Sequence, residues 1–376
     1  MTTAHPFISA DTPLAGVSVL EIDGEFCGYA GRLLVDLGAT VTRVLFGPEP
    51  QDEDAWILHY GKVDVAIDRA SDEDRLRLAA LLAQSDIVIQ SAGNGAPPEL
   101  DPQSVTVANP GAVQIVLSPA GLDGPAAGWA STDLTRLASG GLLWLGGYSD
   151  GEPVAAHGGQ STSATALFGV VGALLGLIDK ERNGTGHLVD ISSQEVITQG
   201  LETALSEYEL TGAIRQRVGD LPREAGTGIY PCADGYVSMV AGRLGTASAW
   251  RRLREWLVET ETPGADELWD DGWETLSFRQ RPESVRRFAE IFGAFASQRT
   301  KSDLYRQAQM RSIALAPVNT PAEVIVDPQL SARRFFREVV NQESGAVANA
   351  PTAPYRFGDR ESAAVTASEP TAPAAP

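Results

Sequence analysis

The pattern of apolar and polar positions in the N-terminal part of the chain predicts short strands that alternate with helices. Residues 17–22 alternate as a strand does, and residues 29–37 have the spacing of a short amphipathic helix that Gly38 ends. A second strand is predicted at residues 40–45, directly after this glycine. A strand, a helix and a strand in this order predict a parallel unit with a right-handed crossover.

Further apolar runs extend the predicted sheet. Residues 63–67 can form a strand, and Ser71 with the acidic residues that follow it has the pattern of a capped helix start. Residues 86–89 and 113–117 are short runs that look buried on both faces, which is typical of parallel sheets. The alternation of strands and helices predicts a doubly wound α/β fold.

A long helix is predicted from residue 161 to residue 180, and its small residues are expected to permit close approach by another element. These small residues are Ala164, Ala166, Gly169, Gly172, Ala173 and Gly176. Residues 183–191 then predict a turn followed by a strand. Ser192 or Ser193 can cap a further helix that runs to about Leu210.

The composition changes at residues 219–228, where glycine, proline and charged residues are frequent, and a second domain is expected to begin there. Residues 230–239 predict a hairpin, and helices are expected from Trp250 to Arg311. The tryptophans of this part are expected to be core or interface anchors. They are Trp250, Trp256, Trp269 and Trp273. After Arg360 the chain is nearly all Ala, Pro, Ser, Thr and Glu, which predicts a disordered tail.

Composition and charge exclude several classes of protein. A chain of 376 residues suggests two domains, and no apolar run approaches the length that a bilayer requires. Residues 1–13 lack the features of a secretory signal, so a cytoplasmic protein without membrane insertion is expected. The net charge of −20 argues against binding of nucleic acid, and it would also oppose an anionic coenzyme A thioester unless a local cluster of arginine and lysine overrides it.

The cysteines and histidines offer little site chemistry of their own. Cys27 and Cys232 both lie in apolar stretches and are expected to be buried thiols that form no disulfide. Four scattered histidines and two cysteines predict no metal site.

Short motifs along the whole chain point to a known family. In the N-terminal half they are Pro13–Glu21, Ala30–Val44, Asp123–Pro125, Thr132–Leu134, Ala173–Gly186 and Val189–Ile191. In the C-terminal half they are Tyr230–Pro231, Ala233–Val237, Ala316–Val318 and Asp327–Leu330. In this order and at these spacings, from about Pro13 to Phe357, the chain resembles the family III CoA-transferases and the related 2-methylacyl-CoA racemases.

The resemblance implies an α/β fold with a Rossmann-like, doubly wound large domain and an inserted smaller α+β domain. The large domain is expected from residues 1–218 and 326–360, the small domain from residues 225–325, and the tail from residues 361–376. Members of this family form interlocked dimers, so a homodimer or a heteromer with a related chain is expected.

The resemblance also implies substrates and an attacking group. The substrates are an acyl-CoA and a small carboxylic acid, and an aspartate attacks the thioester to form a mixed anhydride and then an aspartyl thioester. Counting back from the Gly184–Gly186 turn places that aspartate at Gln160, Ser161 or Thr162, and no acidic residue lies between Gly158 and Ile178. The attacking aspartate is therefore missing.

Other residues could supply chemistry in its place. The racemase branch uses a histidine and an aspartate as opposed acid and base, but Ser131 and Thr132 stand where its histidine would precede Asp133. Asp133 and Asp190 are expected to be scaffold residues that hydrogen-bond to the backbone. The candidate catalytic residues of this chain are nevertheless His157, Asp133 and Glu195.

The positions that the family uses around coenzyme A are partly altered. Arg43 keeps a basic residue, but Leu45 replaces an acidic one and Phe46 follows it. Gln90, Ser91 and Ala92 stand in place of an acidic residue, an asparagine and a phenylalanine. Lys62 matches a lysine of the family and could meet a nucleotide phosphate, but for a single lysine a solvated surface position is the favoured interpretation. Residues 241–245 could replace a glycine-rich loop of the family or form only a turn.

Three hypotheses follow. The chain is an aspartate-deficient subunit paired with a catalytic homologue. Alternatively, it is a self-sufficient acyl-CoA isomerase, racemase, dehydratase or atypical transferase that uses other residues. In the third hypothesis it is a non-catalytic protein that binds a coenzyme A ligand or has a regulatory role.

Overall fold

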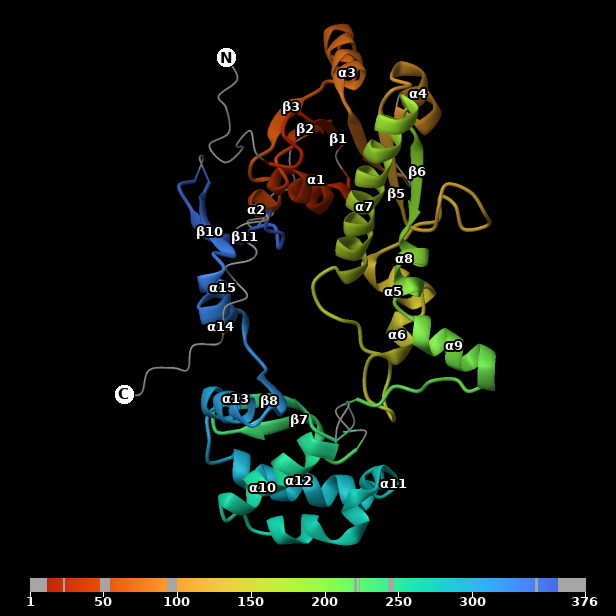
Figure 1. Cartoon of the computed structure of the whole chain (residues 1–376). Helices are drawn as coiled ribbons and strands as arrows, with labels where there is room; N and C mark the ends of the chain where they lie inside the picture. The colour runs from red at the N-terminus through yellow and green to blue at the C-terminus, as the bar shows by residue number, and fades with distance from the viewer. Residues whose placement is uncertain are drawn as a thin grey trace. The chain divides into compact units, whose positions relative to one another are not determined.

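A parallel sheet is the centre of the N-terminal part of this computed structural model, which describes residues 12–22, 24–47, 55–92, 100–219, 222, 224–242, 247–341 and 344–357. Six strands of the described chain form it in the order β3-β2-β1-β4-β5-β6, and every neighbouring pair is parallel. The strands are β1 (Ser18–Ile22), β2 (Thr40–Leu45), β3 (Val63–Ala66), β4 (Ile87–Ser91), β5 (Val113–Ser118) and β6 (Leu188–Ser192). The predicted doubly wound α/β fold is confirmed (Figure 1).

Both faces of β4 and β5 are buried, as their apolar runs predicted. Ile87 and Ile89 of β4 pack into one hydrophobic cluster, whereas Val88 between them packs into a second cluster. Helices α1 (Cys27–Asp36), α2 (Ala55–His59), α3 (Asp72–Gln84) and α4 (Pro102–Ala108) connect the strands. The Ser71 hydroxyl caps α3 by accepting a hydrogen bond from the Asp74 amide, so the predicted helix start is confirmed.

The small residues of α7 (Gln160–Asn183) lie against the sheet. A Cβ atom added to Gly176 would be 2.4 Å from Val113 Cγ1, and one added to Gly169 would be 2.9 Å from Leu117 Cδ2. The predicted close packing is therefore confirmed, and Figure 1 shows α7 alongside β5 and β6.

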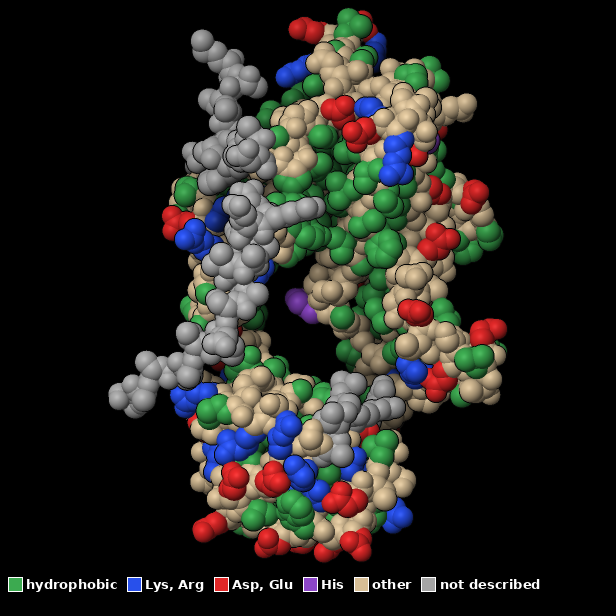
Figure 2. All heavy atoms as spheres, in the orientation of Figure 1, with side chains coloured by type: hydrophobic (Ala, Val, Ile, Leu, Met, Phe, Trp, Pro, Cys, Tyr) green, Lys and Arg blue, Asp and Glu red, His purple; other side chains and the backbone are tan. Residues whose placement is uncertain are grey.

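The opposite side of α7 is apolar and exposed. Its exposed apolar residues are Leu167, Phe168, Val171, Leu175 and Ile178, and Figure 2 shows hydrophobic side chains gathered where α7 lies. By length and composition alone this helix could cross a membrane, so the expectation that no apolar run approaches that length was wrong. The contacts of Gly169 and Gly176 with β5 are those of a helix that covers a sheet.

The segment after β6 differs from the prediction. A single helix to about Leu210 was expected, but α8 (Ser193–Gln199) ends before Gly200 and α9 (Glu202–Thr211) follows. Gly200 disfavours a continuous helix, because fixing a glycine backbone in helical geometry costs more conformational entropy than fixing that of any other residue. The prediction of one continuous helix was therefore wrong.

Contacts within the chain divide it into two units. Unit 1 comprises residues 1–131, 161–196 and 325–376, and unit 2 comprises residues 132–160 and 197–324. The C-terminal part of unit 1 contains α15 (Pro328–Ala332) and a hairpin of β10 (Phe336–Val340) and β11 (Val347–Pro351), while α14 (Pro321–Ile325) lies at the boundary. The domain limits expected from the sequence stay a prediction, and the expected tail of residues 361–376 lies outside the described residues.

Unit 2 is an α+β structure around a small antiparallel sheet. Its strands are β7 (Thr227–Cys232), β8 (Gly235–Val240) and β9 (Ala314–Pro317), and the first two form the predicted hairpin. Besides α9, its helices are α5 (Asp133–Ser139), α6 (Leu142–Leu145), α10 (Ala247–Glu259), η2 (Ala265–Trp269), η3 (Asp271–Glu274), α11 (Leu276–Arg279), α12 (Pro282–Ala296) and α13 (Lys301–Met310).

The aromatic core of unit 2 confirms most of the tryptophan predictions. Trp250, Trp256 and Trp273 are buried in it. Trp269 is 42% exposed, and the Arg254 Cζ atom lies 4.2 Å from the centroid of its ring. Cys27 is buried and Cys232 is half-buried, and neither forms a disulfide.

Candidate functional site

The carboxyl ends of β1 and β4 form a candidate ligand-binding site. The chain runs from β1 to one side of the sheet and from β4 to the other, and ligands of doubly wound folds bind where the strand order reverses in this way. The segment after β1 packs on the end of β4, because the Phe26 amide donates to Ser91 Oγ at 3.3 Å. Cys27 Sγ lies 3.3 Å from the same hydroxyl oxygen, and a Cβ atom on Gly24 would lie 2.5 Å from it. Ser91 therefore anchors the segment between β1 and α1.

Lys62 is buried beneath this segment. Its Nζ atom lies 2.7 Å from Glu21 Oε2, and the two side chains are 0% and 1% exposed. The ammonium group also donates to the Gly28 carbonyl oxygen at 2.8 Å and lies 3.2 Å from His59 Nδ1. The favoured interpretation, a solvated surface lysine, was wrong, because the partners of this ammonium group lie inside the protein.

Burial controls the ionisation of this cluster. Desolvation lowers the pKa of Lys62, although the charge of Glu21 acts in the opposite direction. Burial and then the charge of Lys62 lower the pKa of His59 to about 3, so this imidazole is neutral near pH 7. Position 31 has room only for glycine, because a Cβ atom there would clash with Glu21 Oε2.

The other predicted coenzyme A positions also make internal contacts. Arg43 is 2% exposed and bonds through Nε and Nη2 to the two carboxylate oxygens of Asp64, at 2.9 Å each. Gln90 is buried and donates to the Leu100 carbonyl oxygen at 2.7 Å. Phe46 packs against a core cluster, and the Ala92 amide donates to the Leu117 carbonyl oxygen at 2.8 Å. These contacts hold the sheet and its edges together, and a role in binding coenzyme A stays a prediction for each residue.

The first turn of α7 contains the three residues assigned to the missing aspartate. Ser161 is buried, and its carbonyl oxygen accepts a hydrogen bond from Thr165 Oγ1 at 2.6 Å. The Gln160 side chain donates to the His157 carbonyl oxygen at 2.9 Å. Thr162 Oγ1 donates to Glu25 Oε1 at 3.4 Å. A carboxylate from the segment between β1 and α1 therefore lies beside this turn.

Glu25 is a residue that the sequence analysis missed. It is exposed, and it is separated from Thr162 by 137 positions, so no local pattern joins the two. Its position shortly after the strand predicted at residues 17–22 could have identified it, because ligands of parallel sheets bind at the carboxyl ends of the strands.

The three candidate catalytic residues lie on different elements. Asp133 is the first residue of α5, which Thr132 caps, and His157 is exposed in a glycine-containing loop of unit 2. Glu195 is exposed in the first turn of α8 in unit 1. Asp190 Oδ2 accepts a hydrogen bond from the Leu122 amide at 2.9 Å, as a scaffold residue was expected to do. The catalytic roles of Asp133, His157 and Glu195 stay predictions.

The segment 241–245 was predicted to replace a glycine-rich loop or to form only a turn. Its residues 243–245 lie outside the described residues, so neither alternative is tested.

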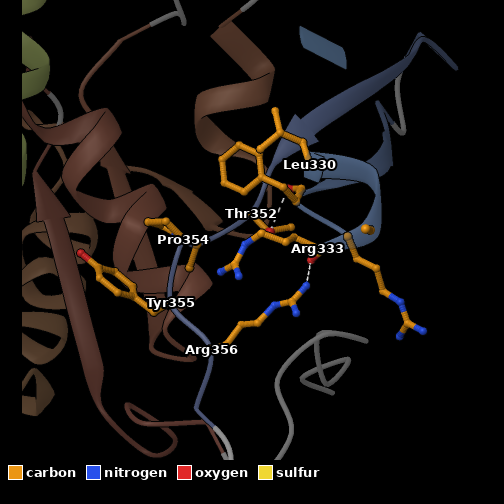
Figure 3. Close-up of a pocket in the computed structure, with 10 residues that line it drawn as sticks. Leu330, Arg333, Thr352, Pro354, Tyr355 and Arg356 are labelled. Atoms are coloured by element: carbon orange, nitrogen blue, oxygen red, sulfur yellow. Dashed lines mark hydrogen bonds between the residues drawn. The ribbon is translucent and has the colours of Figure 1, made fainter. Parts of the chain in front are cut away.

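A second candidate site is a basic pocket of about 750 Å³ in the C-terminal part of unit 1. Three arginines line it together with Phe335 and Tyr355, and they are Arg333, Arg334 and Arg356. Figure 3 shows Arg356 reaching back to the backbone of Arg333, where it donates a hydrogen bond to the carbonyl oxygen. Guanidinium groups are well suited to bind phosphate. The sequence analysis missed this cluster, because 23 positions separate two of its members.

Metal-binding geometry is not found in the described part of the chain, where no group of three or more His, Cys, Asp or Glu side chains is placed to hold an ion.

Comparisons with known proteins agree with the resemblance. Residues 14–374 match CoA-transferase family III. The chain is 30% identical over 364 residues to the succinyl-CoA:(R)-benzylsuccinate CoA-transferase subunit BbsE of Thauera aromatica, covering 91% of this chain and 87% of that protein. It is 26% identical over 359 residues to the succinyl-CoA–L-malate CoA-transferase alpha subunit of Chloroflexus aurantiacus, covering 89% and 81%. The crystal structure of a CAIB/BAIF family protein from Brucella suis superposes with a TM-score of 0.78 at 25% identity, covering 93% of each chain.

Proposed function

Because the chain belongs to CoA-transferase family III, we propose that it transfers coenzyme A from an acyl-CoA to a small carboxylic acid as one subunit of a two-chain enzyme. In this enzyme a related chain carries the attacking aspartate.

The observation that carries the proposal is the absence of an acidic residue between Gly158 and Ile178, in a chain whose family membership is clear. Loss of the attacking aspartate with retention of the fold is the pattern expected when a related partner supplies that group. The names of two relatives support the division, since each is described as a subunit.

The basic pocket supports the coenzyme A part of the proposal. Arg43 and Lys62 are engaged with Asp64 and Glu21, so positive charge for the nucleotide phosphates has to come from more accessible groups. Arg333, Arg334 and Arg356 are exposed around one pocket of a chain with a net charge of −20. We assign these arginines as candidate contacts of the nucleotide part of coenzyme A.

Purification of the protein from its native host tests the two-chain enzyme. A related, aspartate-bearing chain should co-purify, and the complex should transfer coenzyme A from succinyl-CoA to a carboxylic acid. Changing the aspartate of that partner chain to asparagine should remove most of the activity. A pure homodimer of this chain with full activity would refute the division of roles.

A further inference from the structure

We infer that Glu25 is a second attacking carboxylate, so that the chain has a working transfer site of its own. This inference rests on the proposed coenzyme A transfer. It adds a site to the two-chain enzyme and leaves the role of the partner's aspartate unchanged.

The chemistry restricts the attacking group to a carboxylate. Transfer of coenzyme A between two acids has to conserve the energy of the thioester, and an acid anhydride conserves it whereas an ester of serine or threonine does not. Of the acids in or just after the strands, Glu21 is buried against Lys62. Exposed acids at these strand ends are Glu25, Asp68, Asp123, Asp190 and Glu195. Among them, Glu25 accepts a hydrogen bond from Thr162 in the first turn of α7.

The backbone around Glu25 is held firmly while its side chain stays accessible. Gly24 packs on Ser91, and the buried Phe26 donates its amide to the same hydroxyl oxygen. The Lys62 ammonium group holds the Gly28 carbonyl oxygen from below. The exposed Glu25 side chain is thus presented from an anchored backbone at the strand ends where ligands of this fold bind.

The surroundings favour negative charge at this point. Thr162 lies in the first turn of a 24-residue helix, whose N-terminus carries a partial positive charge. The Thr162 hydroxyl stabilises the Glu25 carboxylate, and the helix end favours the oxyanion that forms when a thioester is attacked.

The transfer balances without a redox step or a net proton. A Glu25 oxygen attacks the thioester carbonyl carbon, the C–S bond breaks, and the coenzyme A thiolate leaves behind a mixed anhydride. The thiolate attacks the Glu25 carbonyl carbon, which releases the donor acid as its carboxylate and forms a glutamyl thioester. The acceptor carboxylate attacks the same carbon and expels the thiolate, giving a second anhydride. Attack of the thiolate on the acceptor carbonyl forms the new acyl-CoA and frees the Glu25 carboxylate.

Trapping of the glutamyl intermediate tests this inference. The purified two-chain enzyme is incubated with succinyl-CoA and quenched with hydroxylamine, which converts an activated carboxyl group to a hydroxamate. Peptide mass spectrometry then locates the label. We expect hydroxamate at Glu25 as well as at the partner's aspartate. In a complex whose partner aspartate is changed to asparagine, the label at Glu25 and a residual transfer rate should both persist.

Three variants separate an attacking role from a structural one. Glu25→Gln should abolish the label at residue 25 and the residual transfer, and Glu25→Asp should restore part of both. Thr162→Val should lower the residual kcat by about tenfold at most, which is what a hydrogen bond of ordinary strength contributes. Glu181→Gln, an exposed acid near the other end of α7, should leave all rates unchanged.

The outcomes distinguish this inference from the proposed function. If the intact complex turns over but only the partner's aspartate is labelled, or if the label falls on Glu195, the role of Glu25 is refuted and the two-chain enzyme stands. A complex that shows neither turnover nor label refutes both.

Discussion

Removing the buried ammonium group of Lys62 should destabilise unit 1 far more than removing an exposed lysine. In Lys62→Met the hydrophobic chain is kept, but the Glu21 carboxylate, 1% exposed, loses the partner that lies 2.7 Å away. A buried charge left without its partner costs about 3–5 kcal/mol in the free energy of unfolding. The Gly28 carbonyl oxygen loses a hydrogen bond at the same time.

Lys180 offers a matched control in the same unit. Its Nζ atom lies 3.2 Å from Asp86 Oδ1, but the two side chains are 28% and 40% exposed. An ion pair of this kind contributes about 0–1 kcal/mol, so Lys180→Met should change stability little. The contrast between the two lysines isolates burial as the cause.

Thermal unfolding followed by circular dichroism measures the difference. Each kcal/mol shifts the melting temperature by about 2–4 °C in a unit of this size, so Lys62→Met should lower it by about 6–20 °C. The double variant Glu21→Gln with Lys62→Met removes both charges and should recover much of the loss. If Lys62→Met lowers the melting temperature no more than Lys180→Met does, the assignment of a buried, stabilising ion pair is wrong.

Two further predictions concern pH and ligand binding. The pKa of His59 is about 3 in the folded protein and 6.5 as its ordinary value, so the unfolded chain binds a proton between these values that the folded chain does not. Stability should therefore be complete above pH 6.5 and fall as the pH drops toward 3, by at most about 1.4 kcal/mol per pH unit for one proton. Denaturation in urea across this range should show a weaker pH dependence for His59→Asn than for the exposed control His157→Asn, and equal slopes would contradict the assignment. Replacing Arg333 and Arg356 by serine should weaken binding of coenzyme A in titration calorimetry, and the loss should shrink as salt is added, because salt screens exposed charges. An unchanged affinity would exclude the basic pocket as the nucleotide site.

Local patterns were enough to predict the elements of the sheet. The strands at β1, β2, β4 and β5, the Ser71 cap and the close packing of α7 all follow from residues within a few positions of each other. Strand alternation, helix caps and runs of small residues act over such distances, so they can be recognised without knowing the fold. The break at Gly200 was missed, because a single glycine within a helical pattern is often tolerated.

The sequence by itself determined the fold class, the family and the absence of an acid at the start of α7. Tertiary structure alone decided which charges are buried and which carboxylate approaches that turn. The sequence predicted Lys62 at the surface, but in the structure it is buried against Glu21 and the Gly28 carbonyl oxygen. Glu25 accepts a hydrogen bond from Thr162, which is 137 positions away in the sequence. Contacts of this kind arise from the packing of a helix and a loop onto one sheet, which no short stretch of residues encodes.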